Sequence, residues 1–136
     1  MRTLAIRVIG ADQSCNMYRG AMEHLAGFRI EAAADPNPQA LQAAGEKLGA
    51  RQLFTPPEQM LRYVVLDAVI IASPPFFHLE HVTAAALAGC AVFAEKPLAR
   101  TSVEARAMVD ACRSAGVLFM VGFNRRFLPP PRTARK

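Results

Sequence analysis

Short apolar runs alternate along this chain with stretches whose apolar residues recur every three or four positions. The runs predict strands and the periodic stretches predict helices. We predict strands over 3–9, 28–34, 52–54, 68–72, 91–94 and 117–121, and helices over 15–26, 38–48, 56–63, 78–88 and 102–115. Glycine follows four of these helices, as expected where a helix ends.

Regular alternation of strand and helix with short turns is typical of an α/β fold. Right-handed crossovers then give a Rossmann-type, doubly wound parallel sheet with helices on both faces, in a single domain. We predict that this domain spans 1–128 and that 129–136 form a disordered Pro/Arg-rich basic tail. In such sheets ligands bind outside the carboxyl ends of the strands.

Composition fits this fold and argues against several other classes of protein. Hydrophobic residues make up 52% of the chain, but no run approaches the about 20 apolar residues of a membrane span. The net charge of +5 comes from five basic residues after position 124, without which the chain has 11 basic and 11 acidic residues. We therefore predict no nucleic-acid partner and no membrane partner.

The three cysteines are odd in number and widely spaced, at Cys15, Cys90 and Cys112. This pattern supports neither a disulfide framework nor a zinc site. His78 and His81 share a helix face, but no third ligand follows at a suitable spacing, so we predict no metal. With no targeting segment visible, the cytoplasm is the expected location.

The first strand-to-helix turn begins at Gly10 and continues through Ala11, Asp12 and Gln13. A dinucleotide-binding turn carries three glycines, at its first, third and sixth positions. Here Asp12 and Cys15 occupy the second and third glycine positions, so Asp12 adds a negative charge where a pyrophosphate would approach. The alternative is an ordinary turn in which Asp12 caps the helix.

Two later strands also end in polar residues. Asp35 ends the second strand, where an acidic residue binds the adenosine ribose in dinucleotide-binding folds, and no Arg or Lys follows it to accept a 2′-phosphate. NAD is therefore favoured over NADP, although Asp35 could simply begin the turn at Pro36. The fifth strand ends in Glu95-Lys96-Pro97, which is either an ordinary charged strand end or a site, and its Lys96–Pro97 bond could be cis.

Three segments together resemble the Gfo/Idh/MocA oxidoreductases over residues 3–128. They are Asp67 to Pro75 followed by His78, then Ala94-Glu95-Lys96-Pro97-Leu98-Ala99, and Val121-Gly122-Phe123-Asn124-Arg125-Arg126-Phe127. The resemblance implies a domain that binds NAD or NADP and takes part in hydride transfer with a sugar or cyclitol hydroxyl or ketone. It also implies that Lys96 is the catalytic lysine beside the nicotinamide and the substrate hydroxyl.

The expected cofactor contacts follow from the turn and from this resemblance. They are Gly10, Ala11, Asp12, Gln13, Asp35, Ser73, Pro74, His78, Glu95, Lys96 and Asn124.

Members of the family continue into a larger α+β domain that carries most of the substrate pocket. This chain instead ends in Pro129-Pro130-Pro131 and an Arg-rich segment, which suggests a truncated or frameshifted gene product. We expect a polyol or sugar substrate only if a second domain is supplied, and weak or no activity from the chain alone. Two alternatives remain open: a non-catalytic nucleotide-binding or regulatory module that self-associates or binds a partner, and a doubly wound domain that binds no dinucleotide.

Overall fold

The computed structural model describes residues 2–12, 14–62 and 67–129. Strands and helices alternate along it. The strands are β1 (Leu4–Ile9), β2 (Phe28–Ala34), β3 (Gln52–Phe54), β4 (Ala68–Ile71), β5 (Ala91–Ala94) and β6 (Phe119–Val121). The α-helices are α1 (Ser14–Met22), α2 (Pro38–Leu48), α3 (Pro57–Arg62), α4 (His78–Leu87) and α5 (Ser102–Ser114), and the 3₁₀ turns are η1 (Pro75–Phe77) and η2 (Asn124–Phe127).

The six strands form one parallel sheet in the order β3-β2-β1-β4-β5-β6. The strand order reverses between β1 and β4, so the chain winds outward in both directions from the middle of the sheet. This is the Rossmann arrangement predicted from the sequence, and it is confirmed. The switch between β1 and β4 is where such sheets leave a crevice for a ligand.

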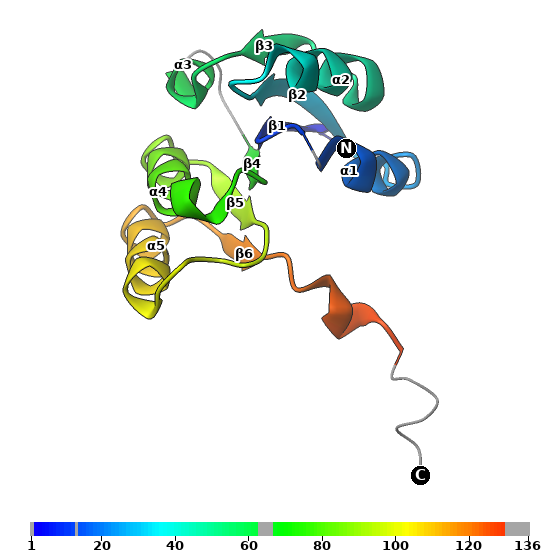
Figure 1. The fold of residues 1–136 in the computed structure, drawn as a ribbon. Helices are drawn as coiled ribbons and strands as arrows, with labels where there is room; N and C mark the ends of the chain where they lie inside the picture. Colours follow the sequence, from blue (N-terminus) through cyan, green and yellow to red (C-terminus); the bar gives the residue numbers. More distant parts are fainter. Residues whose placement is uncertain (1, 13, 63–66, 130–136) are drawn as a thin grey trace.

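Helices cover both faces of the sheet (Figure 1). Helices α3, α4 and α5 pack on one face around a core that includes Met60, Val82 and Met108, and α2 packs on the other around Leu41 and Leu48. Helix α1 lies on the α2 side, with Tyr18 and Met22 against that second core. Within the described residues, no helix is long and apolar enough to cross a membrane.

A bulge in β2 decides which of its residues face which core. The register with β1 shifts after Ile6, which pairs with Ile30, while Arg7 pairs with Ala32. Glu31 is therefore the extra residue, and Ile30 and Ala32 face opposite cores although they are two positions apart. The alternation of faces along β2 therefore breaks at Glu31.

The first helix is four residues shorter at its carboxyl end than predicted. It ends at Met22. The Glu23 amide still donates to the Arg19 carbonyl oxygen, but the His24 and Leu25 amides make only turn-type bonds to Ala21 and Met22. Residues 23–26 are exposed, so helix propensity there is not reinforced by packing against the sheet. Met17, although apolar, is 48% exposed on this helix.

Smaller differences occur at other element ends. The sixth strand begins at Phe119 instead of residue 117, and α3 begins at Pro57 instead of residue 56. The predicted end of α3 at residue 63 and the tail over 130–136 lie outside the described residues, so the domain boundary at 128 stays a prediction. Thr101 caps α5 by accepting a hydrogen bond from the Glu104 amide at 3.1 Å.

Arg7 is a fully buried charged residue in β1. Its Nη1 donates to the carbonyl oxygen of Met60 in α3, whereas Nε and Nη2 have no hydrogen-bond partner among the described residues. Burial lowers the pKa of the guanidinium. An unsatisfied buried donor costs free energy, so Arg7 reduces the net stability of the sheet.

We expect Arg7→Met to raise the free energy of unfolding by about 1–2 kcal/mol. Methionine keeps the apolar stem and removes the charge and both unpaired nitrogens, at the cost of the bond to Met60. Urea unfolding followed by circular dichroism measures the change, and Arg106→Met on the exposed side of α5 is the control. A fall in stability would show that the guanidinium is satisfied in solution.

Candidate functional site

A cavity of about 450 Å³ opens at the carboxyl ends of the central strands. It lies at the switch between β1 and β4, where the sheet order reverses. Its lining residues come from loops after β1, β2, β4, β5 and β6 and from α1: Gly10, Asp12, Met17, Asp35, Ala72, Ser73, Pro74, Pro75, Glu95, Lys96 and Asn124.

Most of the residues that the sequence suggested as cofactor contacts therefore lie together. Ala11 and His78 are fully buried and do not line this cavity, and Gln13 lies outside the described residues.

Two further cavities continue the first one in opposite directions. Toward β2 and α3, a cavity of about 530 Å³ shares Gly10, Asp12, Asp35, Ser73 and Pro74 with the first. Toward β6, a cavity of about 410 Å³ shares Lys96 and Asn124 with it. The three cavities form a row along the strand ends, long enough to offer separate places for different parts of one extended ligand.

The two outer cavities differ in charge. The cavity toward β2 is lined by four carboxylates, and its described lining residues include no Lys or Arg. The four carboxylates belong to Asp12, Asp35, Glu58 and Glu80. The cavity toward β6 is lined by Lys96, Phe123, Asn124, Arg125 and Arg126. None of these described lining residues carries a carboxylate. A ligand that spans the row therefore meets acceptors at one end and cations at the other.

Gly10 makes the first turn possible. Its φ is +89°, and a Cβ built on it would lie 2.3 Å from the backbone nitrogen of Ser73. Only glycine tolerates both the left-handed backbone and this contact. The turn after β1 is thereby held directly against the turn after β4.

Asp35 joins the first turn to the end of β2. It is 7% exposed, and its two carboxylate oxygens accept hydrogen bonds from the backbone amides of Ala11 at 2.7 Å and Asn37 at 2.8 Å. The turn-forming role considered for Asp35 is thus present in the structure. Because each carboxylate oxygen can accept more than one bond, the ribose-binding role stays a compatible prediction.

His78 links two strand-end loops from behind the cavity. Its Nε2 lies 2.7 Å from the Ser73 carbonyl oxygen, and its Nδ1 lies 2.9 Å from the Leu98 carbonyl oxygen. The loop after β4 and the loop after β5 are held together through this one ring. The ring is 1% exposed, so the structure places His78 as a support for the cavity wall.

His81 supports the same wall one turn further along α4. Its Nδ1 lies 2.8 Å from the Ser73 hydroxyl oxygen, and its ring stacks on Phe77 with centroids 5.6 Å apart. Burial lowers the pKa of His81, against the raising effect of Glu80 and Glu58 and with a further lowering from His78. The buried ring is therefore held neutral.

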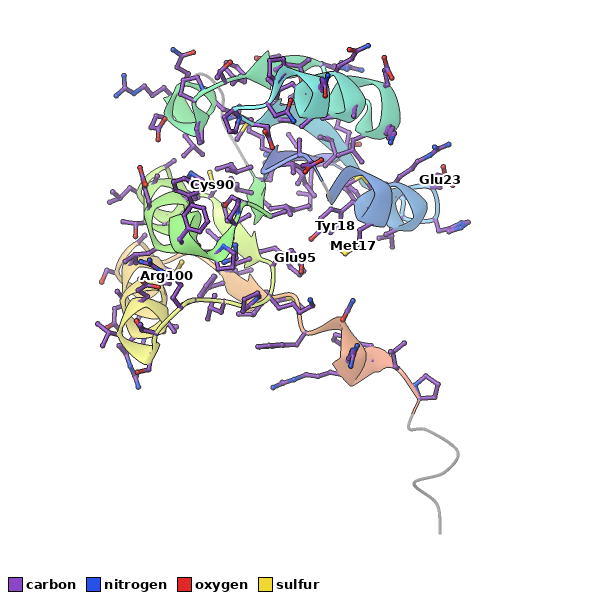
Figure 2. The ribbon with its side chains drawn as sticks, in the orientation of Figure 1. Met17, Tyr18, Glu23, Cys90, Glu95 and Arg100 are labelled. Carbon is purple, nitrogen blue, oxygen red and sulfur yellow. The ribbon has the colours of Figure 1, made fainter. Side chains whose placement is uncertain are left out.

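The charged residues after β5 line the first cavity. Lys96 is exposed there, Glu95 is half-buried, and the Lys96–Pro97 peptide bond is cis. The Glu95 carboxylate accepts a hydrogen bond from the Tyr18 hydroxyl, and Figure 2 shows these two side chains reaching toward each other from α1 and β5. Among the described residues, no group of three His, Cys, Asp or Glu side chains is placed to hold a metal ion.

The family profile for oxidoreductases with an NAD-binding Rossmann fold matches residues 4–123. The chain belongs to the Gfo/Idh/MocA oxidoreductase family. The resemblance seen in the sequence is confirmed, and the described domain is the family's NAD-binding Rossmann domain.

Dehydrogenases of small polyols and sugars are among the similar proteins. The D-glucoside 3-dehydrogenase of Escherichia coli is 34% identical over 125 residues, which cover 91% of this chain and 36% of that protein. The D-apiose dehydrogenase of Paraburkholderia graminis is 40% identical over 122 residues, which cover 90% and 32%. The chain thus spans about a third of the length of these relatives.

One solved structure of the family contains both a nucleotide cofactor and a polyol. It is scyllo-inositol dehydrogenase from Lactobacillus casei with bound NAD(H) and scyllo-inositol, which matches 98% of this chain and 40% of its own with a TM-score of 0.86 and 27% identity.

Sequence reasoning missed several residues of this Gfo/Idh/MocA domain. Glu58 and Glu80 line the second cavity, and His81 holds the Ser73 hydroxyl. Glu58 could have been found, because it lies at the start of α3, shortly after the carboxyl end of β3. Tyr18 lies one helical turn before Met22, and that spacing marks the inward face but not the contact with Glu95.

We expect the stability of this Gfo/Idh/MocA domain to fall as the pH drops below about 6.5, in part through His81. The unfolded chain takes up the His81 proton near the usual value of 6.5, whereas burial keeps the folded ring neutral to lower pH. His81→Asn removes this group, so its stability should change less between pH 7.5 and 5.5. Urea midpoints at the two pH values measure the difference.

His24→Asn provides the matched control, because His24 is exposed on the turn after α1. This variant should keep the pH dependence of the natural sequence. Equal pH dependence in all three proteins would mean that the His81 ring is protonated as easily in the fold as outside it.

Proposed function

We propose that this domain binds NAD and forms the cofactor half of an oxidoreductase that transfers hydride between the nicotinamide and a polyol or sugar hydroxyl or ketone. The observation that carries the proposal is the row of cavities, in which Gly10, Asp35 and Lys96 share one wall at the sheet switch point. The substrates named for the similar dehydrogenases support the chemical class. The 1–128 domain boundary and a cytoplasmic location belong to the same proposal.

The residues present fit a dinucleotide. The close approach of Gly10 to Ser73 leaves the strand-to-helix turn tight, and α1 begins at Ser14 with backbone N–H groups that its own helix does not use. These groups would hold the pyrophosphate, while Asp35 would accept hydrogen bonds from the adenosine ribose. Ser73, Pro74 and Glu95 would border the cofactor between them.

When bound, the nicotinamide accepts or supplies the hydride. Lys96 follows β5 and lines both the first cavity and the cavity toward β6. Its Nζ would bind the reacting oxygen and hold or pass on its proton. Asn124 lines both of these cavities and would orient the same part of the site. An exposed lysine in this place needs a substrate that is held in line with it before hydride transfer becomes efficient.

The cavity toward β2 favours NAD over NADP. A 2′-phosphate in this cavity would lie close to the carboxylates of Asp35, Glu58 and Glu80. The described residues that line the cavity include no Lys or Arg to neutralise it. Like charges repel, and the ribose hydroxyls of NAD can instead donate to these carboxylates.

We expect the 136-residue chain to bind NADH about tenfold or more tightly than NADPH, a difference of about 1.4 kcal/mol. Fluorescence titration of each reduced nucleotide measures both affinities. Asp35→Asn removes one negative charge at nearly constant shape and should narrow the preference, and Asp110→Asn on α5 should leave it unchanged. Binding of neither nucleotide at millimolar concentration would refute the proposed function.

We expect Asp12→Gly to tighten NADH binding by about tenfold, because it removes a carboxylate from the turn that faces the pyrophosphate. Asp12 is exposed and lines both of the larger cavities. Titrations at low and high salt check the cause, since the gain should shrink as salt screens the charge. An unchanged affinity at low salt would show that Asp12 turns away from the bound phosphates.

A second candidate function is a non-catalytic dinucleotide-binding or regulatory module. It is favoured by the exposure of Lys96. This candidate predicts NADH binding without oxidation of inositol or glucosides by the 136-residue chain. It also predicts self-association or a partner, which sedimentation would detect.

A further inference from the structure

Tyr18 makes a long-range contact that neither the fold nor the family assignment explains. It lies on α1, and its hydroxyl donates to Oε1 of Glu95, which is 77 positions away in the sequence. The phenol ring stands edge-on to Phe93 of β5, with centroids 6.5 Å apart and an interplanar angle of 83°. Ring packing and hydrogen bond together aim the hydroxyl at the end of β5 (Figure 2).

Gly122 borders the same carboxylate from the end of β6. A Cβ at this position would lie 3.0 Å from Oε2 and 3.2 Å from Oε1 of Glu95. Gly122 is buried, and its amide donates to the Ala94 carbonyl oxygen at 2.8 Å, so its backbone cannot move away freely. A larger residue would therefore displace the carboxylate.

The remaining contact of the carboxylate leads to Lys96. Oε2 of Glu95 accepts a hydrogen bond from the Lys96 backbone amide at 3.2 Å. Both side chains line the first cavity, so a displaced carboxylate would change the surroundings of Lys96 there. Glu95 is thus fixed from α1, from β6 and from its own loop.

We propose that Tyr18 is a positioning residue for Lys96: with Gly122 it fixes the Glu95 carboxylate, which sets the backbone and the electrostatic surroundings of the lysine. Burial, followed by the hydrogen bond to Glu95 and its charge, raises the pKa of Tyr18, so the phenol remains a donor at all working pH values. Since α1 also begins at the glycine turn, the helix that would receive the pyrophosphate is joined to the lysine that would receive the substrate. Only this last step rests on the proposed function.

The test needs no cofactor. The chain has three lysines, Lys47, Lys96 and Lys136, and reductive methylation with ¹³C-formaldehyde gives each a dimethylamino resonance that Lys→Arg variants assign. In Tyr18→Phe, which keeps the ring against Phe93, we expect the Lys96 resonance to shift, because the Glu95 carboxylate loses its hydrogen bond from α1. The resonances of Lys47 and Lys136 should stay in place.

Two further variants separate positioning from general damage. Gly122→Ala should also move the Lys96 resonance, because it displaces the same carboxylate. In a Glu95→Gln background, Tyr18→Phe should produce no additional shift, since the charge through which it acts is gone. Thr83→Val on α4 removes a hydroxyl far along the chain and is the control that should leave Lys96 unchanged.

An unmoved Lys96 resonance in folded Tyr18→Phe would overturn the proposal, and so would a full shift in the Glu95→Gln background. Far-ultraviolet circular dichroism establishes that each variant is folded. Because these spectra are recorded without nucleotide, they stand even if NADH fails to bind. The NADH titration tests the proposed function separately, and loss of nucleotide binding alone would leave the role of Tyr18 intact.

Discussion

The close approach of β1 and β4 at their carboxyl ends is the constraint on which the rest of this site depends. The Ala72 amide donates to the Ile9 carbonyl oxygen at 2.8 Å, and one residue later the Gly10 α-carbon meets the Ser73 backbone. Any side chain at Gly10 would force the two turns apart. The cavity between the first turn and the Lys96 loop exists because these turns share one narrow junction, from which the other strand ends spread in both directions.

Charge is distributed along the row of cavities in a way that follows from sheet topology. The carboxylates lie after β2, in α3 and in α4, while the cations lie after β5 and β6. The strand order places β2 and β3 on one side of the Gly10 junction and β5 and β6 on the other. The chain crosses this junction between β3 and β4, which follow each other in the sequence. The polarity of the site is therefore a property of the doubly wound order. Asp12 is exposed and lines both the first cavity and the cavity toward β2.

Sequence patterns predicted the sheet, the strand ends and most cavity residues, because each of these depends on local periodicity and one topological rule. They could not predict contacts made by side chains across long sequence separations. The ring of His78, for example, looked like a cofactor contact at a helix start, yet it is enclosed by two backbone carbonyl groups. The burial of Arg7 could not be predicted either, since its contact with Met60 depends on how α3 packs. Tyr18 showed helical spacing, but its partner Glu95 depends on the relative position of α1 and β5.

These long-range contacts mean that the cavity walls are largely formed before a ligand arrives. His78 ties the loop after β4 to the loop after β5, Asp35 ties the first turn to the end of β2, and Tyr18 ties α1 to Glu95. Each tie uses a buried or half-buried polar group, whose hydrogen bond is costly to leave unmade. The conformational entropy of these loops is therefore lost during folding. A ligand then uses less of its binding free energy to order them. By the same reasoning, the side chains that remain exposed, Asp12 and Lys96, are the parts of the site that a bound molecule must still set in place.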